Sequence, residues 1–374
     1  VMMMESLATP GTPINLQMLD LTVQAMQKTD SIGAKAREII SRFSSRLDSW
    51  TVSNDVLNSQ QCSDDTKFII LTVLKNTIKT SWSQFDQTTK DSIIQFILPQ
   101  SIQLANLNTN QKCVNMADGV IVEILKYEWP NNYPNFINDL LQSMKMSKYA
   151  FKNGMIILQE LAKDIADYNN CGITSERSIE MTDAFEQQFT QIFDVVSSVF
   201  LNQDENVLSD SDVVHSTLKA MKSFISVVDI RFFIATPLFP ILCNNYMSSP
   251  EYAFDVVDIF GEIANAIEMP PEFRELIPTV FKSVIQGLSP IITNENNEVK
   301  TIIASLDPNM VQVLASSLTS FLLRFSNIVL FIDDGMWART AIEWLIQVTE
   351  VAKGDAFHTC LDFWMKVTRT CHND

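Results

Sequence analysis

Two segments of this chain repeat one another, and this repetition constrains the fold more than any other feature. Leu71 to Trp82 reads LTVLKNTIKTSW, and Asp118 to Pro130 reads DGVIVEILKYEWP. At a spacing of about 47 residues their apolar positions coincide, and each copy closes with a Lys and then a Trp. A repeat of this length in a helical chain is typical of stacked helical hairpins, because each hairpin buries its apolar face only against a neighbour.

Apolar residues recur at helical spacing along most of the chain, and Pro and Gly residues mark the breaks. This pattern predicts an all-α fold, a right-handed α-solenoid of HEAT repeats with about seven antiparallel helical hairpins. No alternating run is long enough to predict a sheet. We expect helices over residues 14–27, 31–47, 50–58, 64–82, 86–104, 118–129, 136–144, 149–168, 174–201, 213–227, 252–267, 270–287, 336–351 and 355–370, and one or two over 299–325 with Pro308 as the divide.

The same pattern suggests how the chain is organised. Residues 1–12 contain Pro10 and Gly11 and read as a flexible tail. Residues 13–139 form the first group of repeats, and residues 140–374 form the further ones. Because an array without a capping repeat exposes apolar surface, we expect association or fraying near residues 336–374.

The charge and composition exclude several classes of function. A net charge of −17 and a pI near 4.6 argue against direct binding to nucleic acid or to anionic membranes, and they suit a partner with a basic surface. Only 9 Gly are present, so Gly-rich phosphate loops are not expected. The six Cys form no CxxC pair and, with no secretory leader, are expected to be reduced thiols. No apolar run is long enough to span a bilayer.

The sequence offers little chemistry, so we expect no enzymatic activity and no cofactor or metal. His215 lies in a helical stripe and is interpreted as a packed or surface residue. His358 and Cys360 are separated from Cys371 and His372 by about 15 Å of straight helix, which is too far for one zinc ion. The common phosphate-loop, metalloprotease and serine-hydrolase motifs are missing.

Two interpretations of Trp82 and Trp129 stay open. Large aromatic residues of this kind usually close a hairpin core. Alternatively, they line a concave protein-binding face together with the neighbouring lysines, since solenoids bind partners along such faces. Lys75, Lys79 and Lys126 are expected to be exposed there.

Several motifs resemble the exportin-1 family of nuclear export receptors, in the importin-β superfamily, over the amino-terminal part of that family. The most specific is the segment Glu128 to Asp139, EWPNNYPNFIND, beside the family's EWPxxWPxFIxD. Weaker, collinear matches are Leu74 to Trp82, Asn153 to Leu158, Val214 to Leu218, Glu262 to Ala264 and Cys360 to Trp364. Lys75 stands where the family has an acid.

The resemblance implies a HEAT-repeat receptor that binds the GTPase Ran in its GTP form and shuttles between nucleus and cytoplasm. It implies export cargo with leucine-rich signals as partners, bound in later repeats beyond this chain, and it suggests nucleoporins as a further partner. Family members are far longer, so we expect a piece of a longer protein. The residues expected near Ran are Leu74, Lys75, Ile78, Lys79, Val122, Lys126 and Asn153. The residues expected to hold the motif together are Trp82, Trp129, Pro130, Pro134 and Phe136.

Two other hypotheses remain at this point. A HEAT scaffold unrelated to transport would share the fold but hold other proteins. An all-helical enzyme would bind a metal or a nucleotide.

Overall fold

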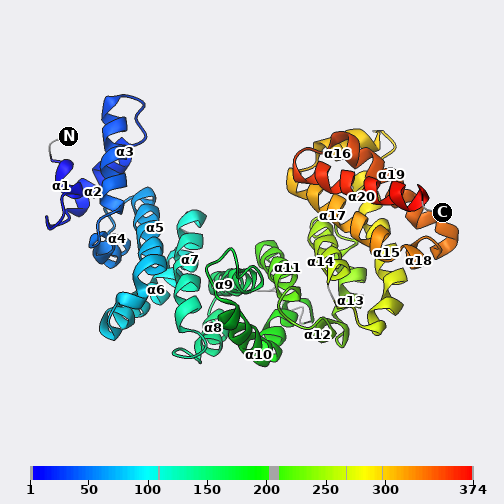
Figure 1. Ribbon diagram of the computed structural model, residues 1–374, viewed down its shortest axis with the longest axis horizontal. Coiled ribbons are helices and arrows are strands. Elements are labelled where there is room, and N and C mark those ends of the chain that lie inside the picture. The colour runs from blue at the N-terminus through cyan, green and yellow to red at the C-terminus, as the bar shows by residue number, and fades with distance from the viewer. Residues whose placement is uncertain (1–2, 108–109, 202–209, 267, 297, 373–374) are drawn as a thin grey trace. The chain divides into compact units, whose positions relative to one another are not determined.

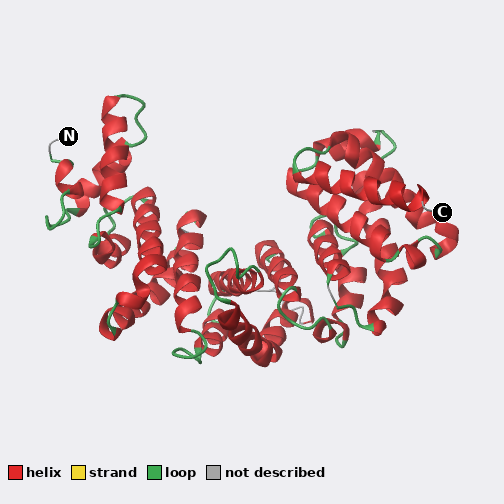
Figure 2. Cartoon of the chain, viewed as in Figure 1, coloured by secondary structure: helices red, strands yellow, loops and turns green. Residues whose placement is uncertain are grey.

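The computed structural model describes residues 3–107, 110–201, 210–266, 268–296 and 298–372, with the side chains of 371 and 372 left out. Over these ranges every regular element is a helix (Figure 2), which confirms the all-α prediction. None of the described helices is both long and apolar enough to cross a membrane.

The chain divides into two compact units, residues 1–164 with 168–181, and residues 165–167 with 182–374. The helices that lie in unit 1 or begin there (Figure 1) are α1 (Glu5–Ala8), α2 (Leu16–Ala25), α3 (Ser31–Ser44), η1 (Ser49–Val52), α4 (Ser53–Asn58), α5 (Asp64–Ser81), η2 (Trp82–Gln84), α6 (Gln87–Asn106), α7 (Gln111–Glu128), α8 (Phe136–Met144), α9 (Lys148–Ala166) and α10 (Ser175–Leu201). Most of α10 belongs to unit 2.

The remaining helices all lie in unit 2. They are α11 (Ser211–Ile225), α12 (Arg231–Ile234), α13 (Leu238–Ile241), η3 (Leu242–Tyr246), α14 (Ala253–Asn265), α15 (Pro271–Ile292), α16 (Val299–Ser305), α17 (Pro308–Arg324), α18 (Ser326–Val329), η4 (Ile332–Gly335), α19 (Met336–Val351) and α20 (Asp355–His372).

Unit 1 is built in two layers of helices. In one layer α2 packs against α5 and α5 against α7, while α4 packs behind α5 and α6 behind α7. The apolar residues of the two sequence repeats meet between these layers, where each is no more than 3% exposed. The predicted correspondence of the repeats is therefore confirmed. These residues are Val73, Leu74, Ile78, Trp82, Val120, Ile121, Leu125 and Trp129.

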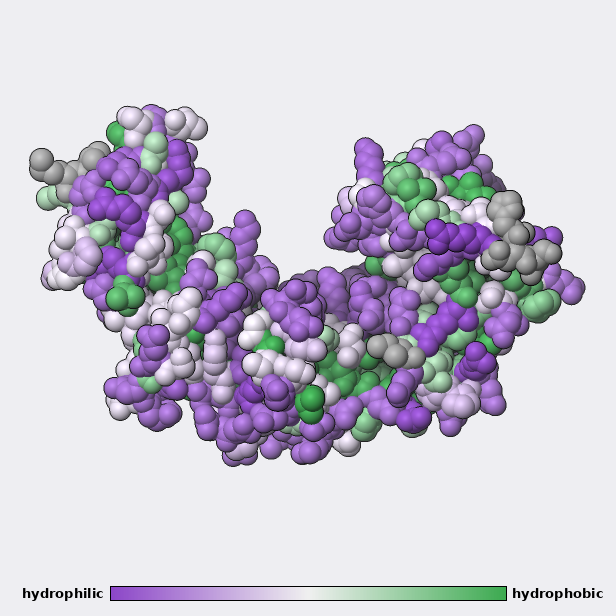
Figure 3. Space-filling view, in the orientation of Figure 1, coloured by the Kyte–Doolittle hydropathy of each residue, from purple (hydrophilic) through white to green (hydrophobic). Residues whose placement is uncertain are grey.

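Unit 2 follows the same plan. One layer runs from α11 through α14 and α17 to α20, each packed on the next, and α15 and α19 lie behind it. α14 and α17 approach closely because Gly261 has no side chain: a Cβ there would lie 2.3 Å from Ser317 Oγ. Aromatic rings fill the space between the layers, as with Phe281 and Phe321, whose centroids are 5.6 Å apart. In the view of Figure 3 the surface is mostly polar, and apolar residues lie in small groups.

Local capping explains many helix boundaries. Asp30 accepts a hydrogen bond from the backbone N–H of Gly33 and so begins α3. Pro308 is the first residue of α17, so of the two possibilities left open for the stretch 299–325 the structure shows two helices, divided at Pro308. The turn at Asp333 and Asp334 has both residues in left-handed backbone conformations.

Three sequence expectations were wrong. The helix expected to end near Gly287 continues to Ile292, because that glycine marks a close approach rather than a break: a Cβ there would lie 2.4 Å from Met247 O. The helix expected over residues 31–47 ends at Ser44, and Leu47 lies beyond it and is 92% exposed.

The third concerns the expected flexible tail over residues 1–12. Glu5–Ala8 forms α1, which packs on α3. Leu7 is buried, and the Arg46 guanidinium donates to the carbonyl oxygens of Leu7 and Thr12 at 2.7 and 2.9 Å. These hydrogen bonds fix a stretch that Pro10 and Gly11 alone would leave loose.

The last helix exposes an apolar stripe. Phe357, Leu361 and Met365 lie at helical spacing on one face of α20, with 36%, 38% and 49% of their surface exposed. Association or fraying near residues 336–374 stays a prediction. Fast hydrogen exchange in α19 and α20 would support it, and strong protection there would contradict it.

Candidate partner-binding face

α5 carries four of the residues expected near Ran, and of these four only the two lysines reach solvent. Leu74 and Ile78 are fully buried, so neither offers side-chain surface to a partner, and their place near Ran stays a prediction. Lys79 is exposed. Lys75 is half-buried because its side chain lies across Gly119 of α7, where an added Cβ would come within 3.1 Å of its Nζ. The surface that α5 offers to a partner is therefore smaller than the sequence suggested.

α7 contributes less to this face than expected. Val122 is only 2% exposed. The side chain of Lys126 is 10% exposed and lies between two carboxylates, with its Nζ 2.9 Å from both Glu123 and Asp164. It also donates to Cys171 O at 3.2 Å. Lys126 therefore joins α7 to α9 instead of projecting into solvent, and its expected exposure was wrong.

Electrostatics keeps Lys126 charged in this site. Burial alone would lower the pKa of its ammonium, but the hydrogen bonds to Asp164 and Glu123 outweigh burial and leave the pKa raised. The ammonium therefore remains a fixed internal cation between the two carboxylates.

Asn153 was also expected near Ran, and it is 3% exposed. With its amide nitrogen turned toward Asp118, it donates to Asp118 Oδ2 at 2.7 Å, and its oxygen lies 2.8 Å from Ser101 Oγ. Ser101 in turn donates to Asp118 Oδ1 at 2.6 Å. These three buried side chains join α6, α7 and α9.

Burial raises the pKa of Asp118 to about 8, although the hydrogen bonds from Ser101 and Asn153 act in the opposite direction. The nearby charge of Glu160 adds to the rise. Sequence reasoning missed this residue. The signal was available, because Asp118 stands where the other repeat has Leu71, a fully buried residue.

Both tryptophans of the repeats are buried, as the packing interpretation predicts. Trp82 Nε1 donates to Glu128 Oε1 at 2.7 Å, and Lys90 Nζ lies 5.7 Å from the centre of the Trp82 ring. The backbone carbonyl of Trp129 accepts a hydrogen bond from Arg177, whose Nε also donates to Lys126 O at 3.0 Å. Arg177 was not anticipated, since no pattern in the sequence marks it.

The turn after α7 is organised around the backbone carbonyl of Glu128. Glu128 O accepts from the backbone N–H groups of Asn132 and Tyr133 at 2.8 and 3.0 Å. The Trp129–Pro130 peptide is cis. Phe136 is 2% exposed and packs edge-on against Tyr133 at 5.6 Å between centroids, while Pro134 is exposed on the turn. Trp129, Pro130 and Phe136 therefore fix where α8 begins.

On α5 and α7, the residues that stay accessible to a partner form a small cationic and aromatic surface. Lys79 and part of Lys75 project from α5, and Tyr127 of α7 is 39% exposed, with its hydroxyl donating to Lys79 O at 3.1 Å. Farther along, Lys163 and Glu160 of α9 form an exposed ion pair at 2.9 Å. Such a surface can bind an acidic or mixed-charge protein surface. We call Lys75, Lys79 and Tyr127 the α5–α7 face.

The histidines and cysteines form no metal centre in the described part of the chain, where no group of three or more His, Cys, Asp or Glu side chains could hold an ion. His215 contacts Asp255 across α11 and α14 and is 31% exposed, as a surface pair. Cys360 is buried, His358 is exposed, and the side chains of Cys371 and His372 lie outside the described residues.

Comparison with known proteins supports the resemblance seen in the motifs. The family described as Exportin 1-like protein matches residues 110–260, and the importin-β N-terminal domain matches residues 36–103. Exportin-1 of Drosophila melanogaster is 24% identical over 367 residues, which is 96% of this chain and 34% of that protein. Exportin-1 of Schizosaccharomyces pombe is 22% identical over 380 residues, and Arabidopsis thaliana exportin 1B is 25% identical over 371. The chain thus spans about a third of the length of these relatives.

Solved structures show the same fold at low sequence identity. The exportin Cse1 in its cargo-free, cytoplasmic state matches with a TM-score of 0.53 and 12% identity, over 94% of this chain and 44% of that one. A second structure matches with a TM-score of 0.50 and 12% identity, over 91% of this chain and 46% of that one. Its description states that Kap95p binding induces the switch loops of RanGDP to adopt the GTP-bound conformation. The α-solenoid fold predicted from the repeats is confirmed.

Proposed function

Because this chain is exportin-1-like over nearly its whole length, we propose that it acts as the amino-terminal, Ran-binding part of a nuclear export receptor. The observation that carries the proposal is the collinear match to exportin-1 proteins over 96% or more of the chain. The match to the importin-β N-terminal domain covers α5, which supplies both lysines of the α5–α7 face.

We assign the direct contact to the exposed residues of the α5–α7 face. Lys79 and Lys75 contact the GTPase directly, with Tyr127 beside them. Leu74, Ile78 and Val122 support α5 and α7 from the interior, and Lys126 and Asn153 hold α7 against α9 and α6. A solenoid positions such residues through helix packing, so a change in the curvature of the stack changes their spacing.

The mechanism would be thermodynamic coupling. Ran in its GTP form and an export cargo favour the same arrangement of the repeats, so each raises the affinity for the other. The groove for leucine-rich export signals lies in repeats beyond this chain. The same receptor would shuttle between nucleus and cytoplasm, with nucleoporins as transient partners.

Binding to Ran loaded with GTP or with GDP tests the proposal, by surface plasmon resonance with the chain immobilised. We expect binding of the GTP form only. Lys79→Glu should weaken it about tenfold, because the exposed cation of the α5–α7 face is replaced by a carboxylate of opposite charge. Lys112→Glu is the matched control, since Lys112 is an exposed lysine in the first turn of α7, at the opposite end from Lys126. Equal binding of both nucleotide forms, or equal loss in the two variants, would favour a scaffold unrelated to transport.

A further inference from the structure

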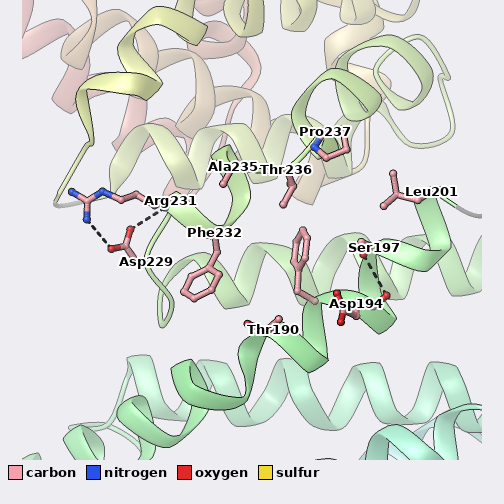
Figure 4. A pocket seen from close by; sticks show the side chains of 11 residues that line it. Thr190, Asp194, Ser197, Leu201, Asp229, Arg231, Phe232, Ala235, Thr236 and Pro237 are labelled. Carbon is pink, nitrogen blue, oxygen red and sulfur yellow. Dashed lines mark hydrogen bonds and ion pairs between the residues drawn. The ribbon is translucent and has the colours of Figure 1, made fainter.

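The cavities of the two units differ in the side chains that border them. In unit 2 a cavity of about 620 Å³ lies between α10 and the segment that contains α12, and Phe193 and Phe232 border it (Figure 4). In unit 1 a cavity of about 160 Å³ lies among α6, α8 and α9, and it borders Ser101 and Asn153. Ser101 is fully buried and Asn153 is 3% exposed, so the cavity of unit 1 reaches polar side chains deep in the fold.

Ser101, Asn153 and Asp118 form a ring of polar contacts that needs one hydrogen more than an ionised Asp118 allows. The Ser101 hydroxyl has one hydrogen, yet its oxygen lies against two others, Asp118 Oδ1 at 2.6 Å and the amide oxygen of Asn153 at 2.8 Å. If Asp118 is ionised, the hydroxyl serves only one of these two contacts. A proton on Asp118 supplies the missing hydrogen, because the carboxyl then donates to Ser101 and the hydroxyl turns to Asn153. The Asn153 amide donates to Asp118 Oδ2 at 2.7 Å, so the ring closes.

The need for this proton does not depend on which way the Asn153 amide is turned. In the opposite orientation the amide nitrogen donates to Ser101 Oγ at 2.8 Å, and the hydroxyl donates to Asp118 Oδ1. The amide oxygen then lies 2.7 Å from Asp118 Oδ2, and again only a proton on the carboxyl fills that contact. Burial favours the same protonated state, because it raises the pKa of Asp118 to about 8.

The surroundings of the ring also disfavour an ionised Asp118. Glu160 of α9 carries a like charge, and in the described part of the chain no basic side chain is among the groups that shift the pKa of Asp118. On α5, the side chain of Lys75 lies across the next residue of α7. Tyr133 and Asp139 line the cavity beside the ring, and Asp139 is exposed. The cavity therefore links the ring with solvent, which can take up a released proton.

We propose that Asp118, Ser101 and Asn153 form a proton-linked clasp that holds α7 against α6 and α9. With the carboxyl protonated, the three side chains complete their ring and the clasp is closed. When α7 separates from the other two helices, the solvated carboxyl ionises and passes its proton to water, so each opening releases one proton. Lower pH therefore keeps the clasp closed, and higher pH favours its opening. The stack of unit 1 responds to pH at this one joint.

The pH range of the effect follows from the two states of Asp118. In the open state the carboxyl has the ordinary pKa near 4, whereas in the closed clasp its pKa is about 8. Between these values the equilibrium constant for opening rises about tenfold per pH unit. It is constant below about pH 4, where both states are protonated, and above about pH 8, where both are ionised.

Hydrogen exchange of the whole chain, resolved along α6, α7 and α9, measures the opening. Asp118→Asn is the comparison at each pH, because its amide can donate to Ser101 and accept from Asn153 but releases no proton. We expect the ratio of the wild-type to the variant exchange rate in α7 to rise about tenfold between about pH 6 and about pH 7. Asp91→Asn, at an exposed carboxylate of α6 outside the ring, is the matched control, and its ratio to the wild type should stay constant.

Difference infrared spectra detect the proton itself, through the carbonyl band of a protonated carboxylic acid. We expect the spectrum of the wild type minus that of Asp118→Asn to show this band at about pH 7, where ordinary carboxylates are ionised, and to lose it above about pH 9. The wild type with isotope-labelled aspartate should show the same band by itself. That measurement tests the proposal even where Asp118→Asn disturbs folding.

Three outcomes would overturn the proton-linked clasp. The first is the absence of the carboxylic acid band at about pH 7. The second is an exchange ratio in α7 that does not change with pH, and the third is an equal change with Asp91→Asn. Ran binding does not enter these measurements, so the clasp is tested independently of the proposed function.

Discussion

The two units of this chain join their stacked helices in different ways. In unit 1, buried polar side chains connect neighbouring helices: Lys126 lies between carboxylates of α7 and α9, and Asp118 accepts hydrogen bonds from Ser101 and Asn153. In unit 2 the interior between helices is dominated by aromatic rings. Among the described residues of unit 2, the ion pairs lie at the surface, as between Lys222 and Asp258.

One pair of contacts isolates the difference. Lys126–Asp164 and Lys222–Asp258 both have a nitrogen–oxygen distance of 2.9 Å and both join successive helices of a stack. Their lysine side chains are 10% and 38% exposed. The two pairs have equal nitrogen–oxygen distances, but we expect their loss to change the free energy of unfolding by different amounts. Removing one partner of a buried pair leaves a poorly solvated charge behind, whereas water solvates the charge left by an exposed pair. Unit 1 should be more sensitive to charge and pH, and unit 2 to the loss of apolar volume.

The largest effect of a substitution at one fixed pH is expected from an aromatic deletion in unit 2. Phe224 is fully buried against Phe185 and Phe189, at 5.6 and 5.7 Å between centroids. Phe224→Ala should lower the free energy of unfolding of unit 2 by about 3–5 kcal/mol, because it leaves a cavity among close-packed rings. Hydrogen exchange resolved along the chain measures this, with Phe331→Ala as an exposed control. Equal loss of protection in both units would show that they do not unfold separately.

Next comes the buried lysine of unit 1. Lys126→Met leaves Glu123 and Asp164 without their cation, and we expect a loss of about 3 kcal/mol in unit 1. The variant keeps a side chain of similar length, so most of the loss reflects the unpaired carboxylates. Hydrogen exchange resolved along the chain measures the loss in unit 1, because the six tryptophans are divided between the two units. A loss below about 1 kcal/mol would mean that water solvates the two carboxylates.

The third prediction concerns pH. An unfolded Asp loses its proton near pH 4, but Asp118 holds its proton up to about pH 8 in the fold. Between these values the folded state binds the extra proton, so its contribution to stability is complete below about pH 4 and falls as the pH rises to about 8.

Asp118→Asn removes this proton. The stability of the wild type minus that of the variant should therefore decrease by up to about 1.4 kcal/mol per pH unit across the window. Denaturation midpoints at a series of pH values measure the difference. A constant difference would show that the pKa of Asp118 is ordinary.

The smallest effect is expected at the surface pair that matches Lys126. Lys222→Met should change the stability of unit 2 by less than about 1 kcal/mol, and high salt should remove even that. The measurement is the same denaturation series with and without salt. A loss of stability as large as that of Lys126→Met would show that the exposed pair of unit 2 stabilises the fold as much as the buried pair of unit 1.

Much of the fold could be predicted because its causes are local. The repeat around Trp82 and Trp129 fixed the helical period, and side chains such as Asp30 placed helix starts within a residue or two. The end of α15 was missed because a glycine can either break a helix or permit a close approach. Only the neighbouring Met247 backbone shows which of the two occurs at Gly287.

The candidate site was predicted less well than the fold. Helical periodicity identified the apolar stripe of α5 correctly, yet Leu74 and Ile78 belong to the interior rather than to the binding face. Lysines look alike in a sequence, but Lys79 is exposed while Lys126 is enclosed by carboxylates, one of them 38 positions away in α9.

By itself, the sequence determined the all-helical class, the repeat length, most helix boundaries and the exportin-1 likeness, since these depend on periodicity, capping and motif order. Only the tertiary structure decided which lysines are free, that Asp118 is buried with a raised pKa, and that Phe193 and Phe232 border one groove. Those properties arise when helices from distant parts of the chain remove water from one another, and the spacing of residues along a single helix does not encode that.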